Sequence, residues 1–334
     1  MSHKVILDVD PGIDDAIAIM TALRSYEIEL IGISTVYGNV TPQVGIMNTL
    51  KVLESMNRMD IPVILGAQRP LMKDPLPSTI KKRKEIIHGK SGLGNLYSSP
   101  YLINEALKKR IIKGNMPSNI TNHKNFIEFV DEINKHYRDG DISIIATGPL
   151  TNIAQAILYR PKFITKISQL SIMGGAYRLG SNITGNITKY AEFNFYCDPE
   201  AARVVLSSPY LNSKIKVVGL DVAQQPSCEL NREFVNKVRQ KLSIEKPSSM
   251  ELILSLLDFK LSHYTVFHLH DVLAVLLHEK PSYFSFRRGN IKIMLGGKLR
   301  GHTKFIDDRT SGNIQVTTAV KDHEFTNFLY SRLV

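Results

Sequence analysis

Short apolar, β-branched runs alternate along most of this chain with longer stretches in which apolar residues recur at helical spacing. The run at 5–9 is typical of a buried strand, and the apolar residues between Ile13 and Met20 then follow at helical spacing. The same alternation predicts further strands at 29–36, 62–65, 142–146, 167–173, 216–220, 291–295 and 314–319, and helices at 42–57, 126–137, 150–159, 199–208, 231–261 and 322–333. The stretch 66–94, which contains Pro75 and Pro77, is expected to be a long loop. Strands that alternate with helices predict an α/β fold, with an open, mostly parallel Rossmann-like sheet flanked by helices.

The first junction between a strand and a helix carries four carboxylates in the run DVDPGIDD, namely Asp8, Asp10, Asp14 and Asp15. In open parallel sheets, ligands bind outside the carboxyl ends of the strands, so this run is the first candidate site. A hard cation such as Ca²⁺ or Mg²⁺ would offset the repulsion between such acids. The alternative is that Asp14 and Asp15 only favour the positive N-terminal end of the helix.

Length and composition limit the kind of protein. A chain of 334 residues allows one elaborated α/β domain or two, and because no linker divides it, we predict a single domain over 1–334. A hydrophobic content of 43% is ordinary for a globular protein, and no apolar run is long enough to span a bilayer. The first strand starts directly after the N-terminus, without a signal-peptide pattern, and only two cysteines are present, so we predict a reducing, cytoplasmic location.

The formal net charge of +11 raises the question of nucleic-acid binding, with basic runs at 81–84 and 108–110. No recognised nucleic-acid-binding motif accompanies these runs, and solvated surface explains them. We therefore predict neither a nucleic-acid partner nor a membrane partner.

Seven blocks in order resemble the inosine–uridine-preferring nucleoside hydrolases, the family of nucleoside N-ribohydrolases. They are DVDPGIDD at 8–15, YGNV at 37–40, HGKSGLGN at 88–95, ATGPLTNIA at 146–154, MGGAY at 173–177, AEFNFYCDPEAA at 191–202 and HLHDVLAV at 268–275. One block alone would be weak, but ordered blocks from residue 4 to about 278 form a specific signal. The chain departs from the family pattern at 97–124, which is longer and less patterned.

The resemblance implies calcium-dependent hydrolysis of the N-glycosidic bond of ribonucleosides to ribose and free base. It implies one Ca²⁺ held by Asp10, Asp15, the Thr147 carbonyl and Asp271, with Asp10 also taking the proton of the attacking water. It implies that ribose is bound by Asp14, Asn39, Asn186, Glu192, Asn194 and Asp271. A homodimer or a homotetramer is expected, without a choice between them.

The residues alone leave several of these roles open. Asn39 follows Gly38 and is as well explained by a turn as by a site. Glu192 and Asn194 are two residues apart, so on an extended segment they would point to one face, yet a half-buried strand has the same pattern. A strand-to-helix turn at Thr147 would serve without any metal.

Two histidines are candidates for assisting the leaving base. His88 and His270 can titrate near neutral pH, and a donor near the base would lower the barrier to cleavage. The alternative is that His88 closes a Gly-rich turn and His270 orients Asp271. The chain has no Trp, so stacked indoles cannot activate a purine, and the resemblance favours pyrimidine or broad uridine and inosine specificity.

Two other classes of protein are alternatives to a nucleoside hydrolase. A haloacid-dehalogenase-like phosphatase would use Asp8 and Asp10 with Asp307 and Asp308, but this leaves the AEFN and HLHD blocks unexplained. A non-catalytic, calcium-dependent nucleoside-binding protein would have lost catalytic acids, and every expected acid is present. The histidines before Asp271 do not have the spacing of a tetrahedral zinc site.

Overall fold

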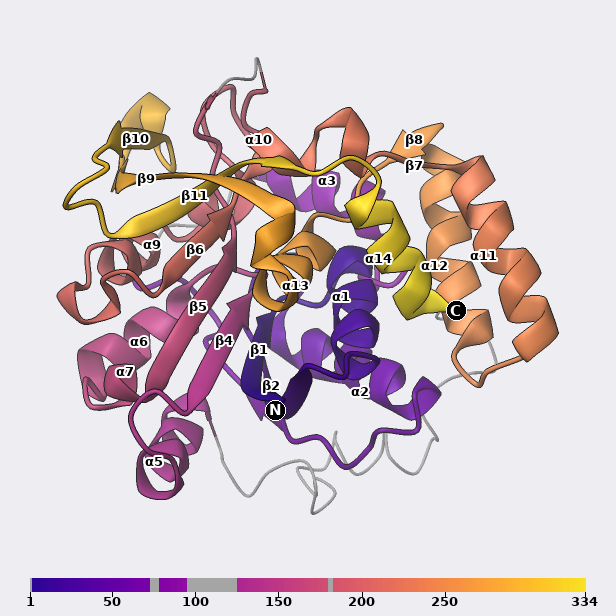
Figure 1. Cartoon of the computed structure of the whole chain (residues 1–334), viewed down its shortest axis with the longest axis horizontal. Coiled ribbons are helices and arrows are strands. Elements are labelled where there is room, and N and C mark those ends of the chain that lie inside the picture. Colours follow the sequence, from indigo (N-terminus) through magenta and orange to yellow (C-terminus); the bar gives the residue numbers. More distant parts are fainter. Residues whose placement is uncertain (1, 73–77, 95–124, 180–182) are drawn as a thin grey trace.

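A nine-stranded sheet forms the centre of the computed structural model, which describes residues 2–72, 78–94, 125–179 and 183–334 (Figure 1). The strands are β1 (His3–Val9), β2 (Ile28–Thr35), β3 (Val63–Leu65), β4 (Ile142–Ala146), β5 (Ile167–Met173), β6 (Ile215–Val218), β9 (Phe284–Ile293), β10 (Thr303–Asp307) and β11 (Ile314–Val320). Their order is β10-β9-β11-β6-β5-β4-β1-β2-β3, and only β9 pairs antiparallel with its neighbours. The predicted open, mostly parallel sheet is confirmed. A separate two-stranded sheet pairs β7 (Leu230–Asn231) with β8 (Val266–Phe267).

Helices cover both faces of the sheet because its central strands are apolar on both sides (Figure 1). On β1, Val5, Leu7 and Val9 belong to the core on one face, whereas Ile6 belongs to the core on the other. The first face is covered by α1 (Ile13–Leu23), α2 (Pro42–Ser55), α13 (His270–Glu279) and α14 (Glu324–Leu333), and the second by α5 (Phe126–His136), α6 (Thr151–Tyr159), α7 (Phe163–Lys166) and α9 (Pro199–Leu206). None of the described helices is long and apolar enough to cross a membrane.

The strand order reverses between β1 and β4, which places a crevice at their carboxyl ends. From β1 the chain proceeds outward to β2 and β3 on one side, and then to β4, β5 and β6 on the other. Asp8 of β1 is in register with Ser34 of β2 and Ala146 of β4, so the loops after these three strands leave the sheet together. Such a switch point is where α/β sheets bind ligands.

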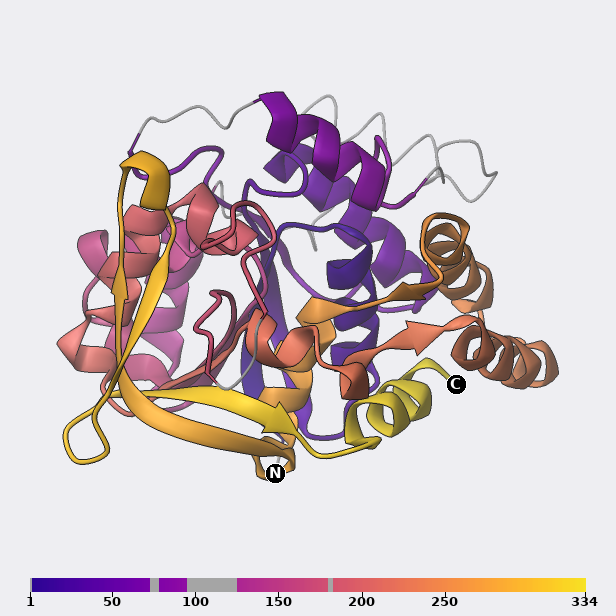
Figure 2. The same ribbon diagram turned by 90° about the horizontal axis from the view of Figure 1, so that it is seen from above.

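Three predictions about local structure were wrong. The segment 66–94 was expected to be a long loop, but it contains the helix α3 (Ser78–His88), which lies across the upper part of the molecule in Figure 2. The segment 191–195 was expected to be extended, but Glu192 is the N-cap of α8 (Phe193–Cys197). The single helix expected at 231–261 is two helices, α11 (Arg232–Glu245) and α12 (Met250–His263), because Lys246 has a left-handed backbone that ends the first.

Other differences lie in the C-terminal part of the sheet. β9 begins seven residues before the strand predicted at 291–295 and forms a hairpin with β10, which the sequence pattern did not predict. The strand expected at 216–220 ends at Val218, and the short α10 (Leu220–Ala223) follows. The segment 97–124 and Asn182 in the loop after Met173 lie outside the described residues.

Candidate active site

The carboxyl ends of β1, β2 and β4 bring Asp10, Asn39 and Thr147 together. The Asp10 Oδ2 atom accepts the Asn39 main-chain N–H at 2.6 Å. The Thr147 N–H donates to the Asp8 carbonyl at 2.9 Å, which continues the pairing of β1 with β4 beyond the strands. Asp8 itself lies inside the sheet, where its Oδ1 accepts Ser34 Oγ at 2.5 Å and Asn152 Nδ2 at 2.7 Å. Asp8 therefore supports the strands, and Asp10 is the acid at the edge.

Asp15 ties the start of α1 to this edge. Its carboxylate accepts the Gly12 N–H at 3.0 Å and the Asp10 N–H at 3.3 Å, as a carboxylate in the first turn of a helix is expected to do. It also accepts the Thr147 hydroxyl at 2.8 Å and the Asn39 amide at 3.4 Å. The prediction that this acid favours the helix terminus and the prediction that it belongs to the site are thus compatible.

Three carboxyl groups meet under the crevice in protein surroundings that disfavour their charge. Burial, followed by repulsion from Asp15, raises the pKa of Asp10 well above its usual range. Burial and repulsion from Asp15, Asp14 and Asp10 also raise the pKa of Asp271, the second residue of α13, well above its usual range. Burial also raises the pKa of Asp15. Ionised acids at such positions require a counter-charge.

The carboxylate oxygens of Asp10, Asp15 and Asp271 and the Thr147 carbonyl suit a hard cation, although several of these oxygens already accept hydrogen bonds from the protein. Asp10 Oδ1 is buried and has no hydrogen-bond partner among the described residues, which leaves one carboxylate oxygen for a ligand. The Thr147 carbonyl accepts Asn194 Nδ2 at 2.7 Å and has a second lone pair. Within the described ranges, no three His, Cys, Asp or Glu side chains surround a common point at metal-ligand spacing. Carboxylate and carbonyl oxygens are the ligands that Ca²⁺ and Mg²⁺ prefer.

Asp14 has a different environment and faces the pocket. Lys260 Nζ lies 2.6 Å from Asp14 Oδ1, and both side chains are buried. The His270 main-chain N–H donates to Asp14 Oδ2 at 3.4 Å. Burial alone would raise the pKa of Asp14, but the Lys260 ammonium and two nearby imidazoles outweigh it and lower that pKa. Asp14 is thus the acid of this cluster that is held ionised by a protein cation.

The AEFN block contributes two buried polar groups through the start of α8. The Glu192 carboxylate accepts the main-chain N–H groups of Asn194 at 2.8 Å, Gly175 at 3.0 Å and Phe195 at 3.2 Å. This carboxylate therefore caps the N-terminus of α8. Asn194 donates to the Thr147 and Met173 carbonyls, at 2.7 and 3.2 Å. The predicted pair therefore lies on a helix terminus, where Asn194 links β4 to β5. Asn186 Oδ1 is buried without a described hydrogen-bond partner.

Both candidate histidines lie at this site but differ from the prediction that they titrate near neutral pH. His88, at the end of α3, accepts the Ile13 N–H on its Nδ1 at 3.2 Å, so its proton is on Nε2. Burial and the Lys260 ammonium lower the pKa of His88 to about 3. Burial lowers the pKa of His270 to about 4, and its ring stacks on His268 at 5.9 Å between centroids. At neutral pH both rings are uncharged.

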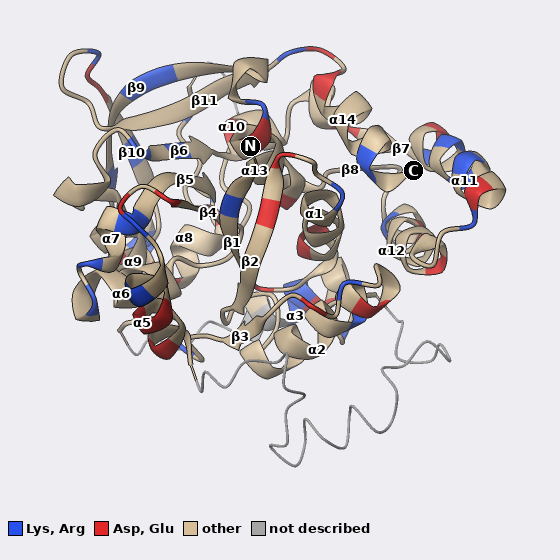
Figure 3. Ribbon diagram, turned by 60° about the horizontal axis from the view of Figure 1, so that its bottom comes forward, with Lys and Arg blue, Asp and Glu red and all other residues tan. Residues whose placement is uncertain are grey.

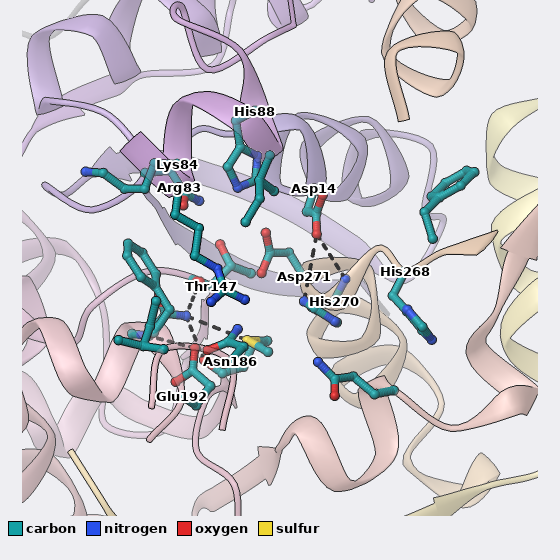
Figure 4. A pocket seen from close by; sticks show the side chains of 18 of the residues that line it. Asp14, Arg83, Lys84, His88, Thr147, Asn186, Glu192, His268, His270 and Asp271 are labelled. Atoms are coloured by element: carbon teal, nitrogen blue, oxygen red, sulfur yellow. Dashed lines mark hydrogen bonds and ion pairs between the residues drawn. The ribbon is translucent and has the colours of Figure 1, made fainter. Parts of the chain in front are cut away.

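A pocket of about 230 Å³ opens above these groups (Figure 4). Its lining includes nine of the predicted residues, namely Asp14, Asn39, His88, Thr147, Asn186, Glu192, Asn194, His270 and Asp271, while Asp10 and Asp15 are fully buried and do not line it. Two walls lie beyond the sheet edge. One is α3, with Ile80, Arg83 and Lys84, and the other is the segment from Lys260 to His268.

Sequence reasoning missed the cations of both walls. Lys84 donates to the Gly38 carbonyl, next to Asp10, although its basic run was interpreted as solvated surface. Lys260 was not considered. The helical spacing of Ile253, Leu256, Leu257 and Lys260, all of which are buried, was a usable signal for it.

The fold and the pocket define an α/β protein with an acidic, sugar-sized site at a topological switch point. Comparison with known proteins identifies its relatives. The model of the family "Inosine-uridine preferring nucleoside hydrolase" matches residues 5–327. Uridine nucleosidase 1 of Arabidopsis thaliana is 32% identical over 90% of this chain and 81% of its own length. The pyrimidine-specific ribonucleoside hydrolase RihA of Escherichia coli is 32% identical over 100% of this chain and 99% of its own.

A solved structure agrees with these sequence relatives. The purine-preferring ribonucleoside hydrolase from Gardnerella vaginalis is 27% identical, superposes with a TM-score of 0.80, and covers 99% of this chain and 98% of its own. The chain belongs to the inosine–uridine-preferring nucleoside hydrolase family and is an enzyme that hydrolyses the N-glycosidic bond of ribonucleosides.

The alternative of a phosphatase is wrong, for a physical reason as well as by comparison. Asp307 ends β10, the outermost strand, where it pairs with Arg287, and Asp308 caps an exposed turn with Ser311. Asp8 and Asp10 belong to β1 and the loop after it, at the centre of the sheet, with five strands between β1 and β10 in the order β9-β11-β6-β5-β4. The four acids cannot form one phosphatase site.

Proposed function

We propose that this nucleoside hydrolase depends on Ca²⁺ held by Asp10, Asp15, Asp271 and the Thr147 carbonyl. The observation that carries the proposal is the buried Asp10 Oδ1, which has no hydrogen-bond partner in the described part of the chain and lies in a cluster of acids whose pKa values are raised by burial and mutual repulsion. Four oxygen donors without Cys or His suit Ca²⁺ better than zinc. A bound Ca²⁺ would orient the water and the sugar hydroxyls and lower the pKa of that water.

Asp10 is the proposed general base. Its Oδ2 is fixed by the Asn39 N–H at 2.6 Å, so the carboxylate has one orientation, and Oδ1 remains to accept a proton from water.

Ribose is proposed to bind at the sheet edge through Asp14, Asn39, Asn186, Glu192, Asn194 and Asp271. All six line one pocket and offer carboxylate and amide groups to sugar hydroxyls. Of these, Asn186 has a buried oxygen without a described partner, and Asp14 is held ionised. A carboxylate with three main-chain donors, as at Glu192, retains an acceptor site for one hydroxyl.

His88 and His270 are proposed to face the leaving base as neutral hydrogen-bond donors. The Nδ1 atom of His88 is engaged with Ile13, so its Nε2–H is the donor available to the pocket. A neutral imidazole N–H stabilises charge on the base nitrogen or carbonyl without being a strong acid.

For the base, we propose pyrimidine-preferring or broad specificity of the uridine and inosine type. The printed names of relatives support this in part, since they include a uridine nucleosidase and a pyrimidine-specific hydrolase, beside a purine-preferring enzyme. The chain has no Trp to stack on a purine. Initial rates with equal concentrations of uridine, cytidine, inosine and adenosine test this, and a preference for adenosine would refute it.

The proposed setting is the cytoplasm, with ribonucleoside as the partner and neither nucleic acid nor membrane. Both Cys197 and Cys228 are buried and unpaired, which supports a reducing compartment. In the view of Figure 3, basic and acidic residues are interspersed on α11, whereas β9 carries basic residues only. Assembly as a homodimer or homotetramer is proposed from the resemblance and is tested by light scattering.

One experiment separates the proposed enzyme from a nucleoside-binding protein without activity. The purified protein is loaded with Ca²⁺ and incubated with uridine, and reducing sugar and free uracil are measured. Turnover that disappears on chelation and returns with Ca²⁺ supports the proposal. Binding of uridine without any release of uracil would show that the chain is not catalytic.

A further inference from the structure

A buried lysine faces the pocket from a helix that lies outside the main sheet. Lys260 is on the same stripe of α12 as Ile253, Leu256 and Leu257, and it is only 4% exposed. An ammonium group on an apolar stripe lowers the free energy of unfolding unless a partner compensates for its burial. The position therefore requires a specific reason.

The partner is Asp14, which belongs to the proposed ribose site. The 2.6 Å pair between Lys260 Nζ and Asp14 Oδ1 joins α12 to the first turn of α1. An ammonium group has three N–H donors, and Asp14 is the carboxylate that pairs with Lys260 among the described residues. Because Lys260 also lines the pocket, its remaining donors are at hand for a bound molecule.

Lys260 lies where the groups proposed for ribose meet an apolar wall of the pocket. Its partner Asp14 belongs to the proposed ribose site, and the wall that contains Lys260 continues with Tyr264, Val266 and Phe267, whose apolar and aromatic surface suits a planar base. Figure 4 shows Asp14 between His88 on one side and His270 and His268 on the other.

Negative charge on the departing base needs a cation that the candidate histidines do not provide. His88 Nδ1 accepts the Ile13 N–H, so this ring cannot carry a second proton without losing that bond. When the glycosidic bond breaks, its electron pair goes to the base nitrogen and spreads onto the neighbouring carbonyl. Water adds to the sugar carbon, and the proton taken by Asp10 balances the proton that the base finally gains from solvent.

We propose that Lys260 is a further catalytic residue of this enzyme, whose ammonium contacts the leaving base and stabilises its developing negative charge. The proposal rests on the proposed hydrolytic function and adds to it the cation at the base end. It also predicts a specificity: bases with a carbonyl acceptor beside the glycosidic nitrogen, such as uracil, depend most on Lys260.

The test compares a natural substrate with one whose leaving group needs no help. The variant Lys260→Met keeps the length and apolar stem of the side chain. It should lower kcat/KM for uridine by about 10²-fold or more, the usual effect of removing one charge-stabilising donor. For p-nitrophenyl riboside the loss should be about threefold or less, because the phenolate leaves readily.

Controls separate this role from a structural one. Lys260→Arg keeps the charge and should recover most of the activity on uridine, whereas Lys260→Gln should not. Lys241→Met removes an exposed lysine that pairs with Glu245 on α11, and it should leave kcat/KM unchanged for both substrates. Thermal unfolding of each variant is measured, and if Lys260→Met does not fold, the comparison of Lys260→Gln with Lys260→Arg decides.

Equal losses on uridine and p-nitrophenyl riboside would mean that Lys260 acts only by holding Asp14, and would overturn the proposal. Unchanged kcat/KM on uridine would overturn it as well. A wild-type protein that cleaves neither substrate would instead refute the proposed function, so the two failures are distinguishable.

Discussion

Asp10→Asn is the substitution that most directly tests the proposed base. The change replaces one carboxylate oxygen by an NH₂ group of nearly the same size. If the remaining oxygen takes the place of Oδ2, it still accepts the Asn39 N–H at 2.6 Å, and the NH₂ group takes the place of Oδ1, which has no described partner to lose. The fold should therefore be retained, and the loss of a buried charge beside Asp15 relieves repulsion.

The expected loss in kcat is between about 10² and 10⁴, the scale for a general base, which corresponds to about 3–5 kcal/mol of activation free energy. Steady-state hydrolysis of uridine is measured with Ca²⁺ in excess, and bound Ca²⁺ is measured on the same samples, because Asp10 is also a proposed ligand. Asp60→Asn, an exposed aspartate paired with Arg58, is the control and should behave as wild type. A variant that binds Ca²⁺ and turns over within a few-fold of wild type would refute the role of Asp10.

Three further predictions concern the active site, and a fourth concerns the stability of the fold. Exhaustive chelation should abolish activity and added Ca²⁺ should restore it; full activity without metal would contradict the calcium site. Gly38→Ala places a Cβ 1.9 Å from Asp10 Oδ2, so the carboxylate must move and kcat should fall by about 10²-fold with the fold retained; unchanged kinetics would show that Asp10 tolerates displacement. His88→Ala and His270→Ala should each lose much more activity on uridine and inosine than on p-nitrophenyl riboside, and equal losses would withdraw their role at the base. Burial lowers the pKa of His278 to about 3, so the unfolded state binds the proton first as pH falls below about 6.5; near pH 5 this costs about 2 kcal/mol of unfolding free energy, and denaturant unfolding of His278→Gln should lack that part of the loss between pH 7 and 5.

The sequence was sufficient for the sheet and for the acidic turn at its edge because those features are local. Apolar runs with helical stretches between them specify β1 to β6, and polar residues that directly follow such strands must gather at one edge. Asp10 was found in this way, whereas the family resemblance decided the roles of Asn39 and Thr147. The family resemblance then added the residues from more distant elements, such as Asp271 on α13.

The remaining differences come from tertiary contacts that a local pattern does not contain. Glu192 and Asn194 alternate with phenylalanines as in a strand, but Glu192 gains three main-chain hydrogen bonds by capping a helix. The helix α3 follows Pro75 and Pro77, which were taken as marks of a loop. The neutral state of His88 follows from its burial. The role of Lys260 depends on its ion pair with Asp14, which lies 246 positions away in the chain.

The products of uridine cleavage test most directly whether the chain cleaves ribonucleosides with water. Uridine is incubated with the Ca²⁺-loaded protein in phosphate-free buffer, and uracil, reducing sugar and ribose 1-phosphate are quantified over time. We expect uracil and ribose in equal amounts, at a rate that added phosphate does not change. A requirement for phosphate with formation of ribose 1-phosphate, or no release of uracil at all, would contradict it.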